Sequence, residues 1–560
     1  MIEKRPNNHV IYRNIKSKLR QSKIPRDISY LLVFTFLYKY CSDSLRDYFL
    51  NYIEDKEITL DEAFENPRVR SELESNALNM FGYHIKKPYA FFDEVINTTY
   101  QDRWFLPGLY TAFRDNVTFV KGSNYEKYFN FIFDCVESQC KLEMIEYDPK
   151  INLVIKDIIY SISKLNIYEE RFTFEDVFDE ICKIKPILAD YDPNYMNNLL
   201  AEIVFATKSS PIDVYNPFLN DGSSFVELSL KSNGGYGKFF AKSHDTITFC
   251  SSIVKLFINL FNLDDVFLEF ENALDTIDFY GQSFDAIVSN LPPIGGWSSK
   301  SISKNQEFEL IKRNRRRQLE NILSESFNVD ELSFAKDNKL STAIDSILDE
   351  MDLTQSNIKF EGEYRSLSAS EYLFLINLID TLKDDGVMVV SVSQSFLFKN
   401  SLETLRKYLT YEKNYLDCVI SIPGELARNM RPQIICVFKK NKKLDDVLFI
   451  DLSKDYKIKK DPRSRYISSK KARQLDESSI KKLREAYAKR QIIDKYSNIV
   501  SISEIEANDF NLSVSRYVDT FEGEFIQLSD LANEKAEITA NIKKLNKKID
   551  KMMEDLDLRF

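Results

Sequence analysis

Glycine is scarce in this sequence, with 14 residues among 560, so a turn that contains glycine is more informative than usual. Histidine is scarcer still: His9, His84 and His244 stand too far apart in the sequence to suggest a metal site or a catalytic triad. The seven cysteines show no metal-ligand spacing, and each lies in or near an apolar run. We therefore expect reduced, buried thiols and no metal centre.

Long hydrophobic runs are also missing. The first residues, MIEKRPNNHVIYRN, contain no apolar segment of the kind found in signal peptides. The most hydrophobic stretch, ISYLLVFTFLYKYC, is interrupted by Lys39 and is shorter than a membrane is thick. We interpret that stretch as a core helix and expect a soluble, cytoplasmic protein.

Positive charge is outweighed by negative charge. The 76 lysines and arginines face 86 aspartates and glutamates, which gives a formal net charge of -10. This charge disfavours a protein that holds the nucleic-acid backbone through its overall field. A role on DNA would need a local basic surface or a basic partner.

The chain is long and 44% of its residues are apolar, which is enough for two to four domains. From Asn14 to about Glu180 the apolar residues recur at steps of three and four, with no convincing strand, which predicts an all-helical region. We expect a helical N-terminal domain at 1–165, a Rossmann-like domain at 166–455 and a C-terminal helical region at 456–560.

Short β-rich runs alternate with amphipathic helical patterns between Pro211 and about Leu452. The expected strands are IDVYNPF, YGKFFAKS, DVFLEFENAL, FDAIVSNLPP, VMVVSVSQ, LDCVISIPG, QIICVFKK and DVLFIDLS. This alternation predicts an α/β fold with a doubly wound, mostly parallel sheet. In such sheets ligands bind at the carboxyl ends of the strands.

Two segments depart from the repeat of strands and helices. An insertion at 298–365 is too long for a simple crossover, and its Lys312–Arg317 run is either a phosphate contact or a solvated helical face. The C-terminal segment carries a heptad seam, which predicts either a coiled coil with a partner or a helix packed on this chain. The seam consists of Ile538, Ile542, Leu545, Ile549, Met552 and Leu556.

Two stretches suggest chemistry. DVYNPFLNDGSSFVEL predicts a strand, a loop with Gly222 and a helix, whose N-terminus suits an anionic or polar cofactor group. FDAIVSNLPP ends a later strand with an amide before two prolines. A side-chain amide and a turn carbonyl fixed by proline can both accept hydrogen bonds from the exocyclic amine of adenine. An aromatic residue next in line would stack on a base flipped out of the duplex.

With these stretches in this order, the chain resembles the modification subunit of type I restriction-modification systems, a family of N-6 adenine DNA methylases. The resemblance extends from LLVFTFLYKYCSD through VYNPFLNDGSSF, FDAIVSNLPP, LKDDGVMVVSVSQSFLF and VISIPGEL to the C-terminal seam. It implies S-adenosylmethionine as cofactor and adenine in specific DNA sites as substrate. It further implies a DNA-specificity subunit as partner, with a restriction nuclease subunit as a second candidate.

The family's cofactor residues carry over with departures. Asn216 replaces the first carboxylate of the family's Asp-Pro-x-x-Gly-Ser-Gly-Gly loop, and Asn220 and Ser223 replace two glycines. Lys242 stands where the family has the carboxylate that holds the cofactor ribose, so Asp245 or Glu271 would have to substitute. The candidate cofactor-binding residues are Asn216, Pro217, Asn220, Asp221, Gly222, Ser223, Asp245, Glu271 and Asn272.

The family's methyl-transfer motif, Asn-Pro-Pro followed by an aromatic residue, aligns in two ways. If Asn290 keeps its place, Leu291 replaces the first proline and Pro293 the aromatic residue. If Pro292 and Pro293 are matched instead, Leu291 replaces the asparagine and Ile294 the aromatic residue. Trp297 either stacks on the base or packs the turn. The candidate catalytic residues are Asn290, Leu291, Pro292, Pro293 and Trp297.

Two hypotheses of function follow. In the first, the chain methylates adenine, with Asn290 and the Leu291 carbonyl orienting the amine. In the second, the altered glycine loop, ribose acid and aromatic position leave a catalytically impaired subunit that acts as a structural or DNA-sensing component. A nucleotide-binding oxidoreductase is disfavoured because the chain lacks a Gly-x-Gly-x-x-Gly turn.

Overall fold

The computed structural model describes most of the chain outside one long internal gap. The described ranges are 7–21, 27–54, 58–140, 148–168, 174–184, 194–209, 211–232, 237–260, 262–271, 281–291, 375–423, 433–459, 472–520 and 528–555, with the single residues 25, 142, 235, 273 and 279. Several predictions of the sequence lie outside these ranges: Asn272, Pro292, Pro293, Trp297, Leu556 and the whole insertion at 298–365.

The first part of the chain is helical, as predicted. Its longest helix, α2 (Ile28–Glu54), contains the most hydrophobic stretch of the sequence, and most of its side chains are buried. The other α-helices that the structure describes in this part are α1 (Asn8–Gln21), α3 (Leu60–Glu65), α4 (Pro67–Phe81), α5 (Phe92–Thr99), α6 (Phe105–Arg114), α7 (Asn124–Cys140) and α9 (Pro149–Ser163). The stretch is therefore a core helix, in agreement with the interpretation from sequence.

The expectation that this part contains no strand was wrong. β1 (Tyr83–Ile85) pairs antiparallel with β2 (Val117–Phe119), and the two helices α5 and α6 lie between them in sequence. Each strand has only three residues, too few to show an alternation with period two. Pairing over this separation depends on tertiary packing, which local periodicity does not report.

A nine-stranded sheet forms the centre of the molecule. Its order is β13-β10-β8-β9-β7-β6-β3-β4-β5. The strands are β3 (Val214–Asn216), β4 (Phe239–Ser243), β5 (Val266–Phe270), β6 (Phe284–Asn290), β7 (Leu382–Ser393), β8 (Leu416–Ser421), β9 (Gln433–Lys439), β10 (Asp446–Asp451) and β13 (Ser497–Ser501). Strands β3 to β7 are mutually parallel, whereas β9 runs antiparallel to both of its neighbours. The prediction of a doubly wound, mostly parallel sheet is confirmed.

The winding of the sheet reverses next to β3. From β3 the chain moves outward to β4 and β5, and it then returns to place β6 on the other side of β3. Helices α12 (Ser223–Lys231) and α13 (Thr246–Leu260) make the first two crossovers. In open α/β sheets, ligands bind outside the carboxyl ends of the strands at such a reversal. The fold therefore directs attention to the carboxyl ends of β3 and β6.

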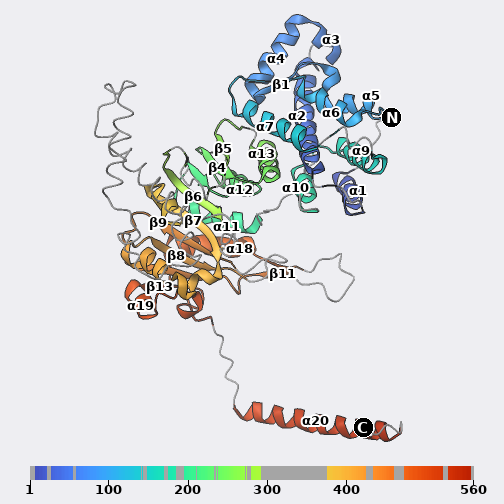
Figure 1. The fold of residues 1–560 in the computed structure, drawn as a ribbon. Coiled ribbons are helices and arrows are strands. Elements are labelled where there is room, and N and C mark those ends of the chain that lie inside the picture. The colour runs from blue at the N-terminus through green and yellow to red at the C-terminus, as the bar shows by residue number, and fades with distance from the viewer. Residues whose placement is uncertain are drawn as a thin grey trace, which may run out of the picture.

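The helical region packs against the outer half of the sheet. In Figure 1 the helices drawn in blue and cyan lie beside α13 and β5. The Tyr128 hydroxyl on α7 donates to the Val266 carbonyl at 2.7 Å and accepts from the Leu268 amide at 2.7 Å, so this helix is hydrogen-bonded to β5. Helices α10 (Phe174–Ile184) and α11 (Asn194–Thr207) follow the helical region in sequence and precede the first strand of the sheet.

The sheet extends beyond the boundary predicted at residue 455. β13 pairs antiparallel with β10 along five residues, and a small sheet joins β11 (Lys457–Lys459) to β12 (Ala472–Gln474). The segment predicted as a C-terminal helical region therefore also contains strands, which the sequence did not indicate because short edge strands in a charged segment show no clear alternation. Its helices are α18 (Glu477–Ala488), α19 (Ile502–Ala507) and α20 (Leu528–Asp555).

Helix α20 carries the predicted heptad seam on an exposed surface. The apolar side chains of the seam, from Ile538 to Met552, are between 50% and 63% exposed. The chain itself does not cover this seam within the described residues. Whether a partner covers it stays a prediction.

Two absences concern the described part of the chain. Among those residues, no helix is both long and apolar enough to cross a membrane. No group of histidine, cysteine, aspartate and glutamate side chains there could hold a metal ion. All seven cysteines are buried and free, as the sequence predicts.

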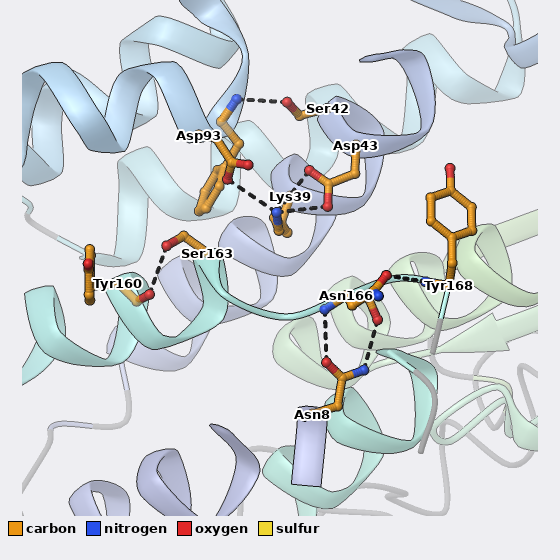
Figure 2. Close-up of polar contacts among 10 residues, drawn as sticks. Asn8, Lys39, Ser42, Asp43, Asp93, Tyr160, Ser163, Asn166 and Tyr168 are labelled. Carbon is orange, nitrogen blue, oxygen red and sulfur yellow. Dashed lines mark hydrogen bonds and ion pairs between the residues drawn. The ribbon is translucent and has the colours of Figure 1, made fainter. Parts of the chain in front are cut away.

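A buried lysine anchors the helical region. Lys39 on α2 is fully buried, and its ammonium group contacts Asp43 at 2.7 Å and Asp93 at 3.2 Å (Figure 2). Asp93 lies in the first turn of α5, so these ion pairs join α2 to α5. Asn8 and Asn166 exchange two hydrogen bonds of 2.8 Å, which join α1 to the segment after α9 (Figure 2). The ion pairs thus satisfy a charge that would otherwise be costly to bury.

The cost of breaking this cluster should depend on which partner is removed. The Asp43→Ala, Asp93→Ala double variant leaves the Lys39 charge buried without a counter-ion and should lose about 3 to 5 kcal/mol of unfolding free energy. Lys39→Met leaves two carboxylates that are 15% and 26% exposed, so water can solvate part of their charge, and this variant should lose less unfolding free energy than the double variant. Urea denaturation measures both, with Arg68→Ala as the control for an exposed ion pair. A larger loss in Lys39→Met than in the double variant would contradict this account.

Candidate functional site

The two predicted halves of the site end adjacent parallel strands. Asn216 is the last residue of β3 and Asn290 the last residue of β6. These strands pair in parallel, with Val214 opposite Ala286 and Tyr215 opposite Ile287. Because parallel neighbours present their carboxyl ends at the same edge, both asparagines lie at the reversal of the sheet. The fold thus brings together the two stretches that the sequence singled out.

The loop after β3 is a tight turn held by its own side chains. The Asn216 Oδ1 atom accepts the Phe218 amide at 3.0 Å, and its Nδ2 atom donates to the Ser224 hydroxyl at 2.9 Å. Asn216 is completely buried, so both bonds are protected from water. Asn216 therefore holds the shape of the loop. The aspartate that the family has at this position could also accept the hydrogen bond from the residue-218 amide.

The loop needs left-handed backbone at two positions. Asn220 has φ +49° and Gly222 has φ +81°. Asparagine is among the few residues with a side chain that tolerate this conformation, so the turn survives the loss of one glycine. At Gly222 an added Cβ would lie 3.3 Å from the Leu256 Cγ atom of α13. Gly222 also precedes the first residue of α12, so the N-terminus of that helix opens at the edge.

A buried ion cluster lies behind this loop. Lys255, inside α13, contacts Asp221 at 3.1 Å and Asp179 of α10 at 2.9 Å. Ser223 joins the cluster, because its hydroxyl donates to Asp221 at 2.9 Å and also accepts from Lys255. Asp221 is completely buried and the Lys255 side chain is only 7% exposed. The sequence did not predict this cluster, since its members are up to 76 residues apart.

The charge of Lys255 follows from its neighbours. Burial alone lowers the pKa of a lysine, but the Asp221 and Asp179 carboxylates outweigh burial and raise the pKa of Lys255 above its usual 10.5. The ammonium group is therefore charged at neutral pH. Its ion pairs link the loop after β3 to α13 and to α10.

The positions predicted to hold the cofactor ribose are occupied by a second ion cluster. Lys242, on β4, contacts Glu269 at 3.1 Å and Glu271 at 2.7 Å, and its side chain is 2% exposed. Glu271 follows the end of β5 and is 41% exposed. Asp245, the other predicted substitute, caps α13, because its Oδ2 atom accepts the Thr248 amide at 3.0 Å and the Thr248 hydroxyl at 2.6 Å.

At the end of β6, the predicted amine acceptors are held by Ser391 of β7. The Ser391 hydroxyl donates to the Asn290 Oδ1 atom, and the Ser391 carbonyl accepts the Leu291 amide at 3.2 Å. Ser391 is completely buried, and Asn290 is 8% exposed. Sequence reasoning missed Ser391. The strand VMVVSVSQ signalled a β-strand, but nothing in it indicated that this serine would lie opposite Asn290 in the register.

The arrangement has a clear chemical capacity. One edge presents a helix N-terminus and turn amides, which suit an anionic or polar group, beside an exposed carboxylate. The same edge presents an amide oxygen and a turn residue at the end of β6, which suit a hydrogen-bond donor. The structure brings together Asn216, Gly222, Glu271, Asn290 and Leu291 at the carboxyl edge, whereas Asp245 serves the helix behind it.

Comparison with known proteins identifies relatives of this chain. Residues 346–524 match a family model described as N-6 DNA Methylase. The type I restriction enzyme MpnII methylase subunit of Mycoplasma pneumoniae is 25% identical over 211 residues, 37% of this chain and 37% of that protein. The MjaVIII methylase subunit of Methanocaldococcus jannaschii is 31% identical over 147 residues, 25% of this chain and 24% of that protein. The matches thus span less than two fifths of these relatives.

Solved structures extend the likeness over the whole fold. A type I restriction-modification system methyltransferase subunit from Streptococcus thermophilus superposes with a TM-score of 0.67 at 20% identity, covering 92% of this chain and 100% of that one. A modification subunit from Vibrio vulnificus gives 0.53 at 12% identity, covering 92% and 96%. At these identities the likeness establishes the fold. The predicted resemblance to type I modification subunits is confirmed.

Removal of Lys255 should destabilise the protein through the loop after β3. Lys255→Met leaves the buried Asp221 carboxylate beside an apolar side chain and should cost about 3 to 5 kcal/mol of unfolding free energy. Adding Asp221→Asn to that variant removes the unpaired charge and should recover part of the loss. Urea denaturation at pH 7 measures both, with Lys231→Met as the control because that lysine is 30% exposed. A double variant less stable than Lys255→Met would show that Asp221 is not the destabilised group.

Proposed function

We propose, from the likeness of this chain to type I methylase subunits in sequence and fold, that it transfers a methyl group from S-adenosylmethionine to the exocyclic amine of adenine in DNA. One observation carries the proposal. The loop after β3 and the asparagine that ends β6 lie on one edge of the sheet, at the reversal of its winding. A donor bound on the first strand would therefore face an amine held on the second.

The residues of the first strand fit the cofactor's polar end. The backbone amides of the loop and the N-terminus of α12 favour a carboxylate such as that of a methionine portion. The two left-handed residues, Asn220 and Gly222, turn the backbone so that the helix begins at the edge. When bound, S-adenosylmethionine supplies an electrophilic methyl group. The chain's own contribution is to hold that cofactor in place.

The residues that end β6 would orient the acceptor. A carbonyl oxygen has two lone pairs, so Asn290 Oδ1 can accept the adenine amine in addition to the Ser391 hydroxyl. The Leu291 carbonyl provides the second acceptor. Both acceptors draw electron density toward the amine nitrogen and fix its direction. In this proposal Pro292 and Pro293 fix the turn, and Trp297 stacks on the flipped base.

DNA and other subunits are the proposed partners. The formal net charge of -10 leaves most of the affinity for DNA to a partner, for which a DNA-specificity subunit is the first candidate and a restriction nuclease subunit the second. The exposed seam of α20 is the proposed contact. A coiled coil would bury apolar side chains that are now at least half exposed.

A second candidate function is favoured by the Lys242 cluster. Lys242 cannot accept hydrogen bonds, Asp245 caps a helix and Glu269 is only 15% exposed, so Glu271, which also pairs with Lys242, is the remaining candidate for a ribose. If Glu271 cannot bind a ribose from this position, the chain would be a catalytically impaired subunit of a restriction or defence complex. It would then serve as a structural or DNA-sensing component.

Asn290→Ala should separate catalysis from cofactor binding. It removes the amide acceptor, so transfer of labelled methyl groups to unmethylated DNA by the assembled complex should fall at least about 100-fold. Affinity for S-adenosylmethionine, measured by calorimetric titration, should change less than about threefold.

Ser289→Ala is the matched control for Asn290→Ala. Ser289 is the preceding residue of β6, and its buried hydroxyl has no hydrogen-bond partner among the described residues. This variant should retain transfer. Absence of cofactor binding by the wild-type chain at millimolar concentration would instead support the impaired subunit.

A further inference from the structure

A nucleoside cofactor presents two ribose hydroxyls, each of which needs a hydrogen-bond acceptor. In doubly wound sheets an acidic side chain near the carboxyl end of the second strand fills this role. Here the second strand is β4, and Lys242 occupies the position. An ammonium group has three donors and no acceptor, so it cannot accept a hydrogen bond from either hydroxyl. The acceptor must come from a neighbour.

Three carboxylates lie near this end of the sheet. The Asp245 Oδ2 atom accepts two hydrogen bonds from Thr248, which fix the carboxylate at the start of α13. Glu269 lies within β5, opposite Lys242 in the register, and its side chain is only 15% exposed. Glu271 follows the last residue of β5 and is 41% exposed. Glu271 is therefore the carboxylate best placed at the edge.

Lys242 determines where the Glu271 carboxylate lies. The lysine side chain is 2% exposed and belongs to a strand paired on both sides, so its position is fixed by the sheet. Its ammonium group donates to the Glu271 Oε2 atom at 2.7 Å. A glutamate just beyond the end of a strand would otherwise sample several rotamers. The ion pair restricts that freedom, and it adds a positive charge beside the carboxylate.

We propose that Glu271 is the ribose-binding carboxylate of this site and that Lys242 is its positioning residue. The acidic residue follows the third strand, β5, instead of ending the second strand, β4. Lys242 occupies the position on β4 and donates a hydrogen bond to this residue, Glu271. This inference rests on the proposed function, because it assumes an adenosyl cofactor at this edge. It specifies the ligand feature that is recognised, a vicinal ribose diol.

Calorimetric titration of the full chain with S-adenosylhomocysteine tests the role of Glu271 without requiring catalysis. Glu271→Gln removes the charge that strengthens the hydroxyl bonds and should weaken binding about 10- to 100-fold. Glu269→Gln loses a bond to the same lysine, but Glu269 lies within the strand and is only 15% exposed, so this variant should weaken binding less than about threefold. The 2′-deoxy analogue should bind wild type more weakly, and Glu271→Gln should add little to that loss.

Variants of Lys242 test the positioning role. Lys242→Met should weaken binding of S-adenosylhomocysteine about 10-fold, and Lys242→Arg, which keeps a donor to Glu271, should recover most of the affinity. Thermal denaturation of each variant separates loss of binding from loss of folding. Wild-type binding with an unchanged Glu271→Gln affinity would overturn this inference alone. No binding by wild type would overturn both this inference and the proposed methyl transfer.

Discussion

The parallel pairing of β3 with β6 is the constraint on which the candidate site depends. Residues 214 and 286 belong to strands far apart in sequence, yet their pairing puts the ends of both strands on one edge. The crossovers through α12 and α13 place β4 and β5 outside β3, so the loop, the ribose position and the amine acceptors follow in order along that edge. If β6 paired elsewhere, the two asparagines would be separated by at least one strand.

Buried lysines recur around this framework. Lys39, Lys242 and Lys255 have side chains no more than 7% exposed, and each contacts two carboxylates. Such clusters contribute little net stability, because desolvation offsets the attraction between the charges. They do fix geometry, since an alternative packing would leave a charge unpaired. In this chain one cluster joins helices of the N-terminal region, and the other two fix the loop after β3 and the carboxylate after β5.

Much of the architecture could be predicted because its signals are local. The strands around Val214 and Phe284 are short apolar runs bounded by turn residues, and the helices between them keep a regular period. β1 and β2 were missed because three residues are too few to show a period. The sheet was predicted to end before residue 455, but β13 lies beyond that residue, in a charged segment that was predicted to be helical.

The site was predicted in its elements but not in its contacts. Asn290 was found from the two prolines that follow it, yet its partner Ser391 is 101 residues away. Asn220 was identified from the sequence only as a replacement for a glycine of the family, whereas its φ of +49° shows that it takes the left-handed conformation of a glycine. From the sequence, Lys242 was interpreted as the loss of the carboxylate that holds the cofactor ribose. Only the pairing of β4 with β5 reveals that it contacts Glu271.

The central claim is that one edge of the sheet, at the reversal between β3 and β6, holds the cofactor. The most direct measurement is a crystal structure of the full chain with S-adenosylhomocysteine. The account predicts electron density for the ligand across the carboxyl ends of β3 and β4, with its thioether sulfur facing Asn290. Ligand density at any other place on the molecule, with this edge filled by the chain's own side chains, would contradict it.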